Sequence, residues 1–369
     1  MRTSWYRRLV ILAILLVLGG CEKKNTPTLV IGAVLPMTGD AGTFGQNAAR
    51  GAELAVREAN NKHLLPGLSA VLKVEDSRGK ASDAVSAATK LIDVSHAKAL
   101  IGDVTSAGTQ AIIPIVTRAQ VPVISPAASD PALSGSSPFF ARVWPSDVYE
   151  AVVIGDYAQH KAYKRIAMLY ANTDYGLGMA REFKKVAGEQ SIVLDIPVDR
   201  ETPDYRPTIQ RISNSRPDAI FLVFYPEDAR RFLQQLAEQR IQLPILATAT
   251  FEDPAVATAP LADHVVFASP VPPSETDPNR ASFVESYTKT FGSGPGVLSD
   301  TGYDAAMILI QAYAARGAEG PKAVADYIRS IKNYEGVSGR MSFNAEGDVQ
   351  KPYKLRTVRL GKFVWLEQQ

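Results

Sequence analysis

The chain has 369 residues, of which 46% are apolar and 21% charged, and 40 basic against 38 acidic residues give a formal net charge of +2. This length predicts two or three domains with full cores, and the composition excludes a disordered or collagen-like chain. The single cysteine excludes an internal disulfide and a multi-cysteine metal site, and the four scattered histidines argue against an all-protein zinc site. The net charge is close to zero and gives no argument for nucleic-acid binding.

The N-terminal residues have the pattern of a secretory signal. Three arginines precede a 12-residue apolar run over 9–20, shorter than the ~20 residues of a membrane-spanning helix. The stretch Leu18–Cys21 resembles the bacterial lipobox, in which the cysteine is lipidated and becomes the new N-terminus. We expect a signal peptide over 1–20, lipidation of Cys21 and a tether over 21–27; an uncleaved anchor with a chance cysteine is the alternative. Removing the three arginines leaves 37 basic against 38 acidic residues, a mature charge of about −1.

From Thr28 onward, short apolar runs alternate with amphipathic helical patterns. Strands are expected at Thr28–Leu35, Ala70–Asp76, Ala99–Gly102, Pro122–Ser125, Arg165–Tyr170, Ile192–Pro197, Ala219–Phe224, Pro244–Ala247 and His264–Ala268. Helices are expected at Asn47–Asn60, Ala81–Asp93, Ser106–Arg118, Val148–Gln159, Leu177–Glu189, Asp228–Gln239, Ser282–Phe291, Asp300–Ala315 and Lys322–Ile331. The strand runs are almost continuously apolar, which favours parallel strands covered on both faces. Pro114 predicts a bend or a break in its helix.

This alternation predicts an α/β protein with two lobes, because so many strand–helix units exceed one compact sheet. Crossing points are expected at 144–147 and at 270–278, where proline, serine and aspartate gather as in linkers. Three helices then follow with hardly a strand between them, and two strands near 339–343 and 355–360 close the chain. Helices without strands form no lobe of this kind, so the chain is expected to return to the first lobe.

Ligands of open α/β sheets bind at the carboxyl ends of the strands, so the loops there are the candidate site. The loop Asp103–Thr109 is small and hydroxyl-rich and precedes a helix, which suits a carboxylate or another small anion. A plain helix N-cap by Thr105 or Ser106 is the alternative. The loop Ser125–Pro131 contains two alanines that allow close approach to the backbone and a serine hydroxyl; its alternative is an ordinary turn.

In the expected second lobe, Tyr175 and Tyr225 follow two strand ends, where they form one wall of a pocket or pack on the surface. The sequence has no G-x-S-x-G elbow, no H-E-x-x-H pair and no Walker loop. His160 is expected to be solvated and His264 to be structural. The prediction is therefore a protein that is not an enzyme.

Five stretches together closely resemble one family, the branched-chain amino-acid-binding proteins of ABC importers, also called the Leu/Ile/Val-binding or type I periplasmic binding proteins. They are Ile31–Gly39, Gly45–Asn60, Val123–Ser129, Asp174–Gly176 and Gly339–Gly347. The resemblance covers 28–366 and implies two Rossmann-like three-layer α/β/α lobes joined by three crossovers, the periplasmic binding protein-like I fold. On this basis we assign 28–146 and 273–340 to the N-terminal lobe, and 147–272 and 341–369 to the C-terminal lobe.

The resemblance also implies a ligand site in the cleft between the lobes. Ser106 would meet the ligand carboxylate, while Ala127, Ala128 and Ser129 would contact the same head group. The second lobe would add tyrosines and the first loop an aromatic residue beside the ligand side chain. The complete expected set is Phe44, Thr105, Ser106, Ala127, Ala128, Ser129, Tyr175, Tyr225 and Glu252.

One position departs from the family pattern. Amino-acid binders of the family pair the ligand ammonium with an acidic residue of the second lobe, but here the loop 247–253 has an alanine or threonine at that place. Glu252 or Asp253 reaches the ligand only if the loop is shifted. Because a buried ammonium without a carboxylate is costly, an α-amino acid is less strongly indicated than the fold. The family also includes binders of amides, urea and aromatic acids.

The implied function is that of an extracytoplasmic substrate-binding lipoprotein of an ABC importer, which captures a small amino acid or a related carboxylate or amide by hinge closure and delivers it to a permease. It would be exported, lipid-anchored through Cys21 in the cell envelope, and would need no cofactor, metal or nucleic acid. The alternative is a ligand-sensing or regulatory lipoprotein of the same fold that acts through a protein partner. Permease and ATPase genes nearby would favour import.

Overall fold

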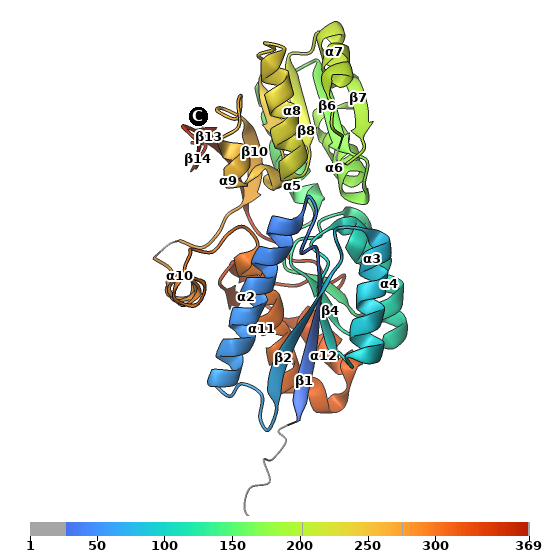
Figure 1. The fold of residues 1–369 in the computed structure, drawn as a ribbon, viewed down its shortest axis with the longest axis vertical. Coiled ribbons are helices and arrows are strands. Elements are labelled where there is room, and N and C mark those ends of the chain that lie inside the picture. Colours follow the sequence, from blue (N-terminus) through green and yellow to red (C-terminus); the bar gives the residue numbers. More distant parts are fainter. Residues whose placement is uncertain (1–26, 201, 275, 368–369) are drawn as a thin grey trace, which may run out of the picture.

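The computed structural model describes residues 27–200, 202–274 and 276–367, which form two α/β lobes arranged one above the other in Figure 1. The expected signal peptide, Cys21 and most of the tether lie outside the described residues. Among the described helices, none combines the length and apolar character needed to cross a membrane.

The first lobe is built on a parallel sheet. Its strands are β1 (Thr28–Leu35), β2 (Ser69–Asp76), β3 (Ala99–Gly102), β4 (Val123–Ser125) and β5 (Phe140–Arg142). They pair in the order β2-β1-β3-β4-β5, all parallel. Its helices are α2 (Gly42–Asn61), α3 (Ala81–Thr89) with the π-turn Lys90–Val94, α4 (Ser106–Ala119), α10 (Pro278–Phe291), α11 (Ser299–Arg316) and α12 (Pro321–Ser330). A short hairpin of β11 (Tyr334–Gly336) and β12 (Gly339–Met341) follows them.

The period-2 alternation of β1 places helices on both faces of this sheet. Ile31 and Leu35 belong to the core that contains the buried faces of α2 and α11, whereas Val34 belongs to the core beneath α3 and α4. On the first face, Gly51 of α2 lets the two helices approach closely, because a Cβ there would lie 1.8 Å from the carbonyl oxygen of Ser299.

The second lobe has a larger, mixed sheet. Its strands are β6 (Ile166–Ala171), β7 (Ile192–Val198), β8 (Ala219–Val223), β9 (Ile245–Ala247), β10 (Val266–Pro270), β13 (Tyr353–Arg359) and β14 (Lys362–Trp365). They pair in the order β14-β13-β10-β9-β8-β6-β7, with β13 antiparallel to both neighbours. Its helices are α5 (Asp147–His160), α6 (Asp174–Ala187), α7 (Arg206–Ser215), α8 (Pro226–Glu238) and α9 (Pro254–Ala257). Short 3₁₀ turns occur in both lobes, at Pro131–Leu133 and Gly317–Glu319 in the first and at Glu189–Ser191 and Ala249–Phe251 in the second.

Two α/β lobes, with a parallel sheet in the first and a mostly parallel sheet in the second, confirm the expected fold class.

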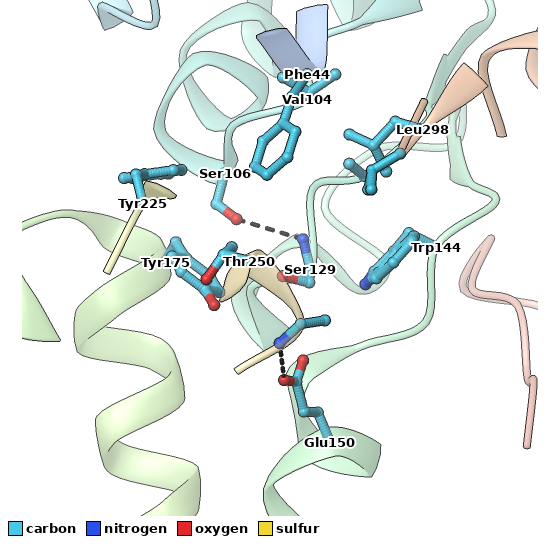
Figure 2. Close-up of a pocket in the computed structure, with 13 residues that line it drawn as sticks. Phe44, Val104, Ser106, Ser129, Trp144, Glu150, Tyr175, Tyr225, Thr250 and Leu298 are labelled. Carbon is cyan, nitrogen blue, oxygen red and sulfur yellow. Dashed lines mark hydrogen bonds between the residues drawn. The ribbon is translucent and has the colours of Figure 1, made fainter. Parts of the chain in front are cut away.

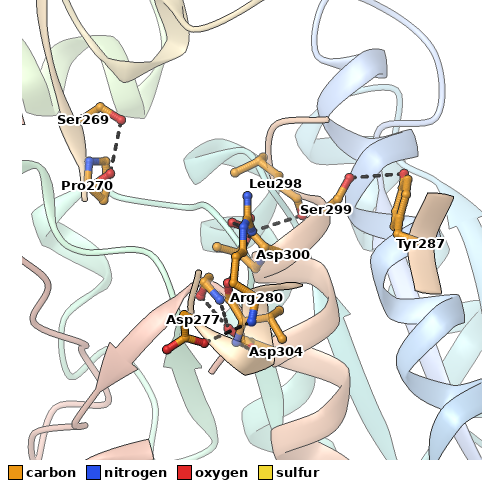
Figure 3. A network of polar contacts seen from close by, with 12 residues as sticks. Ser269, Pro270, Asp277, Arg280, Tyr287, Leu298, Ser299, Asp300 and Asp304 are labelled. Atoms are coloured by element: carbon orange, nitrogen blue, oxygen red, sulfur yellow. Dashed lines mark hydrogen bonds and ion pairs between the residues drawn. The ribbon is translucent and has the colours of Figure 1, made fainter. Parts of the chain in front are cut away.

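The chain crosses between the lobes before α5, after β10 and before β13. After the second crossing, α10 begins at an aspartate cap, where the Asp277 carboxylate accepts the Asn279 N–H at 2.9 Å. Arg280 of the same helix then forms an ion pair of 2.8 Å with Asp300 of α11 (Figure 3). This pair ties the returning segment to the first lobe.

The last crossing lies later than the boundary that we placed at residue 341. Phe343 and Val349 are 1% and 0% exposed and pack in the core of the first lobe, where they also pair across an isolated bridge. Burying these two side chains keeps the chain on the first lobe, and it reaches the second sheet only at Tyr353.

Pro114 does not break its helix, since α4 runs from Ser106 to Ala119 with the proline inside, so of the two expected outcomes the break is wrong. Proline removes the N–H that the carbonyl four residues earlier would accept. Both Pro114 and Gln110 lie on the exposed face of the helix, where water can satisfy that carbonyl.

Candidate functional site

The first lobe contributes the turn that begins α4. Thr105 is the N-cap, and its hydroxyl oxygen accepts the Gly108 N–H at 3.1 Å. This local use of the side chain agrees with the capping alternative, and Thr105 does not line the cavity described below. Ser106, the first residue of the helix, lies where the helix dipole and unpaired N–H groups favour an anion.

The Ser106 hydroxyl connects this turn to the loop after β4. Its oxygen accepts the Ser129 N–H at 3.3 Å and the Asp130 N–H at 3.2 Å. Because the oxygen already accepts twice, the hydroxyl hydrogen is the part of Ser106 that remains to donate to a ligand. The serine is 2% exposed, so its orientation is set by packing.

The loop after β4 is held in place by its own surroundings. The Ser125 hydroxyl oxygen accepts the N–H groups of Ala127 at 3.3 Å and Ala128 at 2.8 Å. Arg142, 0% exposed, donates from its guanidinium to the carbonyls of Ala128 at 3.3 Å and Asp130 at 2.9 Å. Hydrogen bonds to both the backbone N–H groups and the carbonyls of this loop therefore hold its conformation without a ligand.

The second lobe places two tyrosines opposite this loop. Tyr175 and Tyr225 are each 5% exposed, and their ring centroids lie 5.8 Å apart at an angle of 50°. The Tyr175 hydroxyl donates to Thr248 Oγ1 at 2.8 Å. Burial raises the pKa of Tyr225 to about 12, so its hydroxyl keeps its proton near neutral pH.

These groups meet in a cavity between the lobes (Figure 2). Its lining consists of Phe44, Val104, Ser106, Ala127, Ser129, Trp144, Glu150, Tyr175, Tyr225, Ala249, Thr250, Val297 and Leu298. Of the residues expected from the sequence, those lining the cavity are Phe44, Ser106, Ala127, Ser129, Tyr175 and Tyr225. Ala128 is buried and does not line the cavity, and neither do Thr105 and Glu252. Within the described ranges, no three histidine, cysteine or acidic side chains come together as a metal site.

The structure contradicts the expectation that Glu252 reaches the ligand. Its carboxylate forms an ion pair with Arg356 of β13 and accepts the Ser269 hydroxyl at 2.8 Å. Asp253 caps α9 by accepting the Ala255 N–H at 2.8 Å. Both acids of the loop therefore have partners in the surrounding structure, and neither lines the cavity.

Glu150 of α5 is the acid that the sequence reasoning missed. It lines the cavity, is 1% exposed, and its Oε1 accepts the Ala249 N–H at 2.6 Å. Burial, and then the neighbouring Asp147 carboxylate, raise the pKa of Glu150 well above its usual range. The available signal was two acids in the first turn of a helix that begins at a lobe crossing.

Asp147 lies one turn earlier and is 0% exposed. Its backbone N–H donates to the Ser129 carbonyl at 2.9 Å, which joins the start of α5 to the binding loop. Desolvation raises the pKa of Asp147 to about 7, and the neighbouring Ser129 hydroxyl and Arg142 charge offset only part of that shift.

The remaining unpredicted lining residues are mostly apolar. Val104 precedes α4, Trp144 lies in the first crossing, and Val297 and Leu298 precede α11. Figure 2 places Phe44, Val104 and Leu298 at one end of the cavity and Glu150 at the other, with the hydroxyls of Ser106 and Thr250 between them. The cavity therefore has an apolar end and an acidic end.

One side chain of the second lobe reaches the first lobe at the rim of this site. Arg200 donates to Asp40 Oδ2 at 3.2 Å and to the Gly79 carbonyl at 2.9 Å. Its guanidinium carbon also lies 4.9 Å from the ring centroid of Tyr225. These contacts hold the two lobes together beside a cavity-lining tyrosine.

Comparison with known proteins gives a consistent family. The family model described as "Periplasmic binding protein" matches residues 28–362. The chain is 24% identical to Leu/Ile/Val-binding protein homolog 2 of Brucella abortus over 359 residues, which are 96% of this chain and 95% of the relative.

Two solved structures show the same fold. The branched-chain amino acid transporter substrate-binding protein LivJ of Streptococcus pneumoniae, in complex with isoleucine, has a TM-score of 0.83 and 25% identity, covering 91% of this chain and 97% of its own. An ABC transporter solute-binding protein of R. palustris, in complex with benzoate, has a TM-score of 0.83 and 23% identity, covering 92% and 95%.

Proposed function

The chain belongs to the periplasmic binding protein family, and from that premise we propose that it is the substrate-binding component of an ABC importer. It captures a small amino acid or a related carboxylate or amide between its lobes and presents the closed form to a permease. The observation that carries this proposal is the cavity itself, whose lining comes from both lobes. A ligand in contact with both walls stabilises the closed arrangement.

Ser106 and Ser129, which line the cavity between its apolar and acidic ends, receive the ligand carboxylate. Because Ser106 begins α4, the dipole of this helix, the Ser106 hydroxyl and the loop 127–130 all act on the same anion. Tyr175 and Tyr225 close the site from the other lobe, and both keep a hydroxyl proton. A ligand held between these groups is removed from bulk water, and each of its hydrogen bonds is stronger in this less polar surrounding.

We also propose that the protein is exported and anchored by lipid at Cys21. The support is the charged start, the apolar run and the lipobox-like stretch that ends at this cysteine. Mass spectrometry of the protein from its native membrane tests this: a diacylglyceryl adduct on an N-terminal Cys21 is expected, and an intact Arg2 contradicts it.

The ligand proposal is tested by a thermal-shift screen of the purified protein against amino acids, amides and small aromatic acids, followed by calorimetry. We expect at least one compound to raise the melting temperature in proportion to its concentration. Ser106→Ala is expected to weaken its binding by about tenfold to a hundredfold, because a hydrogen bond to a charged group is lost. Tyr175→Ala is expected to weaken it as well.

Ser86→Ala is the matched control, since this serine is exposed on α3 away from the cavity. It should leave the affinity unchanged. Unaltered binding in both Ser106→Ala and Tyr175→Ala, with each variant folded by circular dichroism, would contradict the site assignment.

A further inference from the structure

Two acidic side chains are buried together at the start of α5. Glu150 lines the cavity, and one of its oxygens is held by the Ala249 N–H (Figure 2). Asp147 is fully buried, and its two carboxylate oxygens make no hydrogen bond of good geometry with the described residues, although the Ser129 hydroxyl lies beside them. A buried carboxylate without a partner is costly, so the pair marks a place where positive charge is missing.

The protein's own groups leave this charge uncompensated. Among the described residues, those that shift the pKa of Glu150 are Asp147 and the Ala249 N–H, and neither is basic. The hydroxyls of Tyr175 and Tyr353 also face the two acids, whose charges raise the pKa of both tyrosines after burial. The Tyr353 hydroxyl likewise has no hydrogen-bond partner in the described chain.

Arg142 is the basic residue that acts on Asp147, but its donors are used elsewhere. Its Nε donates to Asp348 at 2.7 Å, one Nη donates to Ser134 at 2.8 Å, and the other donates to two loop carbonyls. Arg142 therefore supports the binding loop and gives the acid pair only a distant charge.

We propose that Glu150, backed by Asp147, determines specificity by binding a protonated amine of the ligand, so that the site takes an amino acid with an apolar side chain in preference to a carboxylic acid without an amine. This inference rests on the proposed function, because it needs a carboxylate ligand in the same cavity. In this proposal the amine binds to a residue of α5 and not to an acid of the loop 247–253. The loop contributes only indirectly, because its Ala249 N–H donates to Glu150 and orients that side chain.

Other residues that line the cavity accommodate the carboxylate and the side chain of the ligand. Ser106 and Ser129 receive the carboxylate, and Phe44, Val104 and Leu298 form the apolar end for the side chain (Figure 2). A ligand without an amine offers these two buried acids no positive charge, so it forms no ion pair with them and they keep their protons. A ligand amine supplies the missing partner.

The test is isothermal titration calorimetry on the purified full chain with two ligand pairs that differ only in the amine. The pairs are L-leucine with 4-methylpentanoate and L-phenylalanine with 3-phenylpropanoate, and benzoate is added as an aromatic acid. We expect the better-fitting amino acid to bind about thirtyfold or more tightly than its amine-free partner. Glu150→Gln, which keeps the size and removes the charge, should lose that factor while binding the amine-free acid equally well or better.

Glu252→Gln is the matched control, because it neutralises an acid of the neighbouring loop that is paired with Arg356 outside the cavity. It should retain the preference for the amino acid. A loss of preference in Glu252→Gln but not in Glu150→Gln would overturn the assignment.

Other outcomes separate this inference from the proposed function. If amine-free acids bind the wild-type protein as tightly as the amino acids, or Glu150→Gln keeps the preference, the inference fails while carboxylate capture stands. If no compound of either class binds, the proposed function fails and the inference fails with it.

A second measurement covers the case in which Glu150→Gln does not fold. Calorimetry of the wild-type protein in two buffers with different ionisation enthalpies counts the protons released on binding. An amino acid should release protons, because its ammonium replaces them on the Asp147–Glu150 pair, whereas an amine-free acid should release none. Equal proton release by both members of a pair would overturn the inference.

Discussion

At the scale of single residues, Arg142 organises the binding loop 127–130. It is fully buried, and its donors reach the carbonyls of Ala128 and Asp130 from behind the cavity. It also pairs at 2.7 Å with Asp348, which precedes the last lobe crossing. A lysine could not make these contacts together, because they need the planar fork of a guanidinium. One side chain thus couples the loop to a crossing segment.

Asp147 makes stability depend on pH in a direction that can be measured. Its pKa rises from 3.8 to about 7 on folding, so between these values the folded state holds more protons than the unfolded state. The free energy of unfolding therefore falls as the pH rises from about 4 to about 7. Asp147→Asn removes this contribution, and we expect its melting temperature to decline less between about pH 5 and pH 8 than that of the wild-type protein.

Two further buried acids shape the same pH profile. Desolvation raises the pKa of Asp103 and of Asp304 to about 6, so the decline in stability is reduced in Asp147→Asn and not abolished. Asp204→Asn is the control, since hydrogen bonds and charge from Arg206 lower the pKa of this exposed acid. A melting profile of Asp147→Asn parallel to that of the wild-type protein would contradict the prediction.

At the scale of elements, the contact between α2 and α11 depends on a glycine. A Cβ at Gly51 would lie 1.8 Å from the Ser299 carbonyl oxygen and 2.9 Å from the Tyr303 N. Gly51→Ala must push the helices apart, and we expect it to lower the free energy of unfolding by about 1–3 kcal/mol in urea titrations.

Gly294→Ala is the matched control, because nothing lies within 4 Å of a Cβ at that position. Its stability should stay close to that of the wild-type protein. If both alanine variants unfold at the same urea concentration, the close helix contact does not have the role assigned to it.

The elements that the sequence did not reveal are short or polar. β5 has three residues, Phe140–Arg142, and contains the buried arginine, so its pattern is not that of an apolar strand. In α7, the buried residues are Ile209 and Ile212, too few to give a clear helical period. The bounds of α11 were predicted to within one residue, whereas α2 begins at Gly42, five residues before the expected start.

At the scale of the whole molecule, Arg200 connects the two lobes, and we expect its contacts to favour their closed arrangement. It joins Asp40 and Gly79 of the first lobe to Tyr225 of the second. Arg200→Ala removes contacts that exist only when the lobes are close, so it should shift the population toward an open form. We expect a larger radius of gyration in small-angle scattering without ligand, and an affinity about tenfold weaker through faster release.

Arg206→Ala is the control for this prediction, because that arginine follows shortly in the chain and pairs with Asp204 within its own lobe. It should change neither the scattering profile nor the release rate. An unchanged profile and affinity in Arg200→Ala would show that the contact across the lobes contributes little to closure.

The sequence by itself determined the two α/β lobes and the loops at the carboxyl ends of their strands. Apolar periodicity, helix caps and small hydroxyl-rich turns act over a few residues, so they can be recognised without the fold. For the same reason Ser106, Ser129 and the two tyrosines could be placed at strand ends, and the structure brings them to one cavity.

Only the tertiary structure decided which acid faces that cavity and how the lobes are joined. Glu150 meets Ala249 across 99 positions, Glu252 is drawn to Arg356 across 104, and Arg200 reaches Asp40 across 160. Sequence spacing carries no signal for pairs so far apart, because their contact depends on how complete sheets and lobes pack. The acid expected from the loop therefore proved to be structural, and one from a helix start took its place beside the cavity.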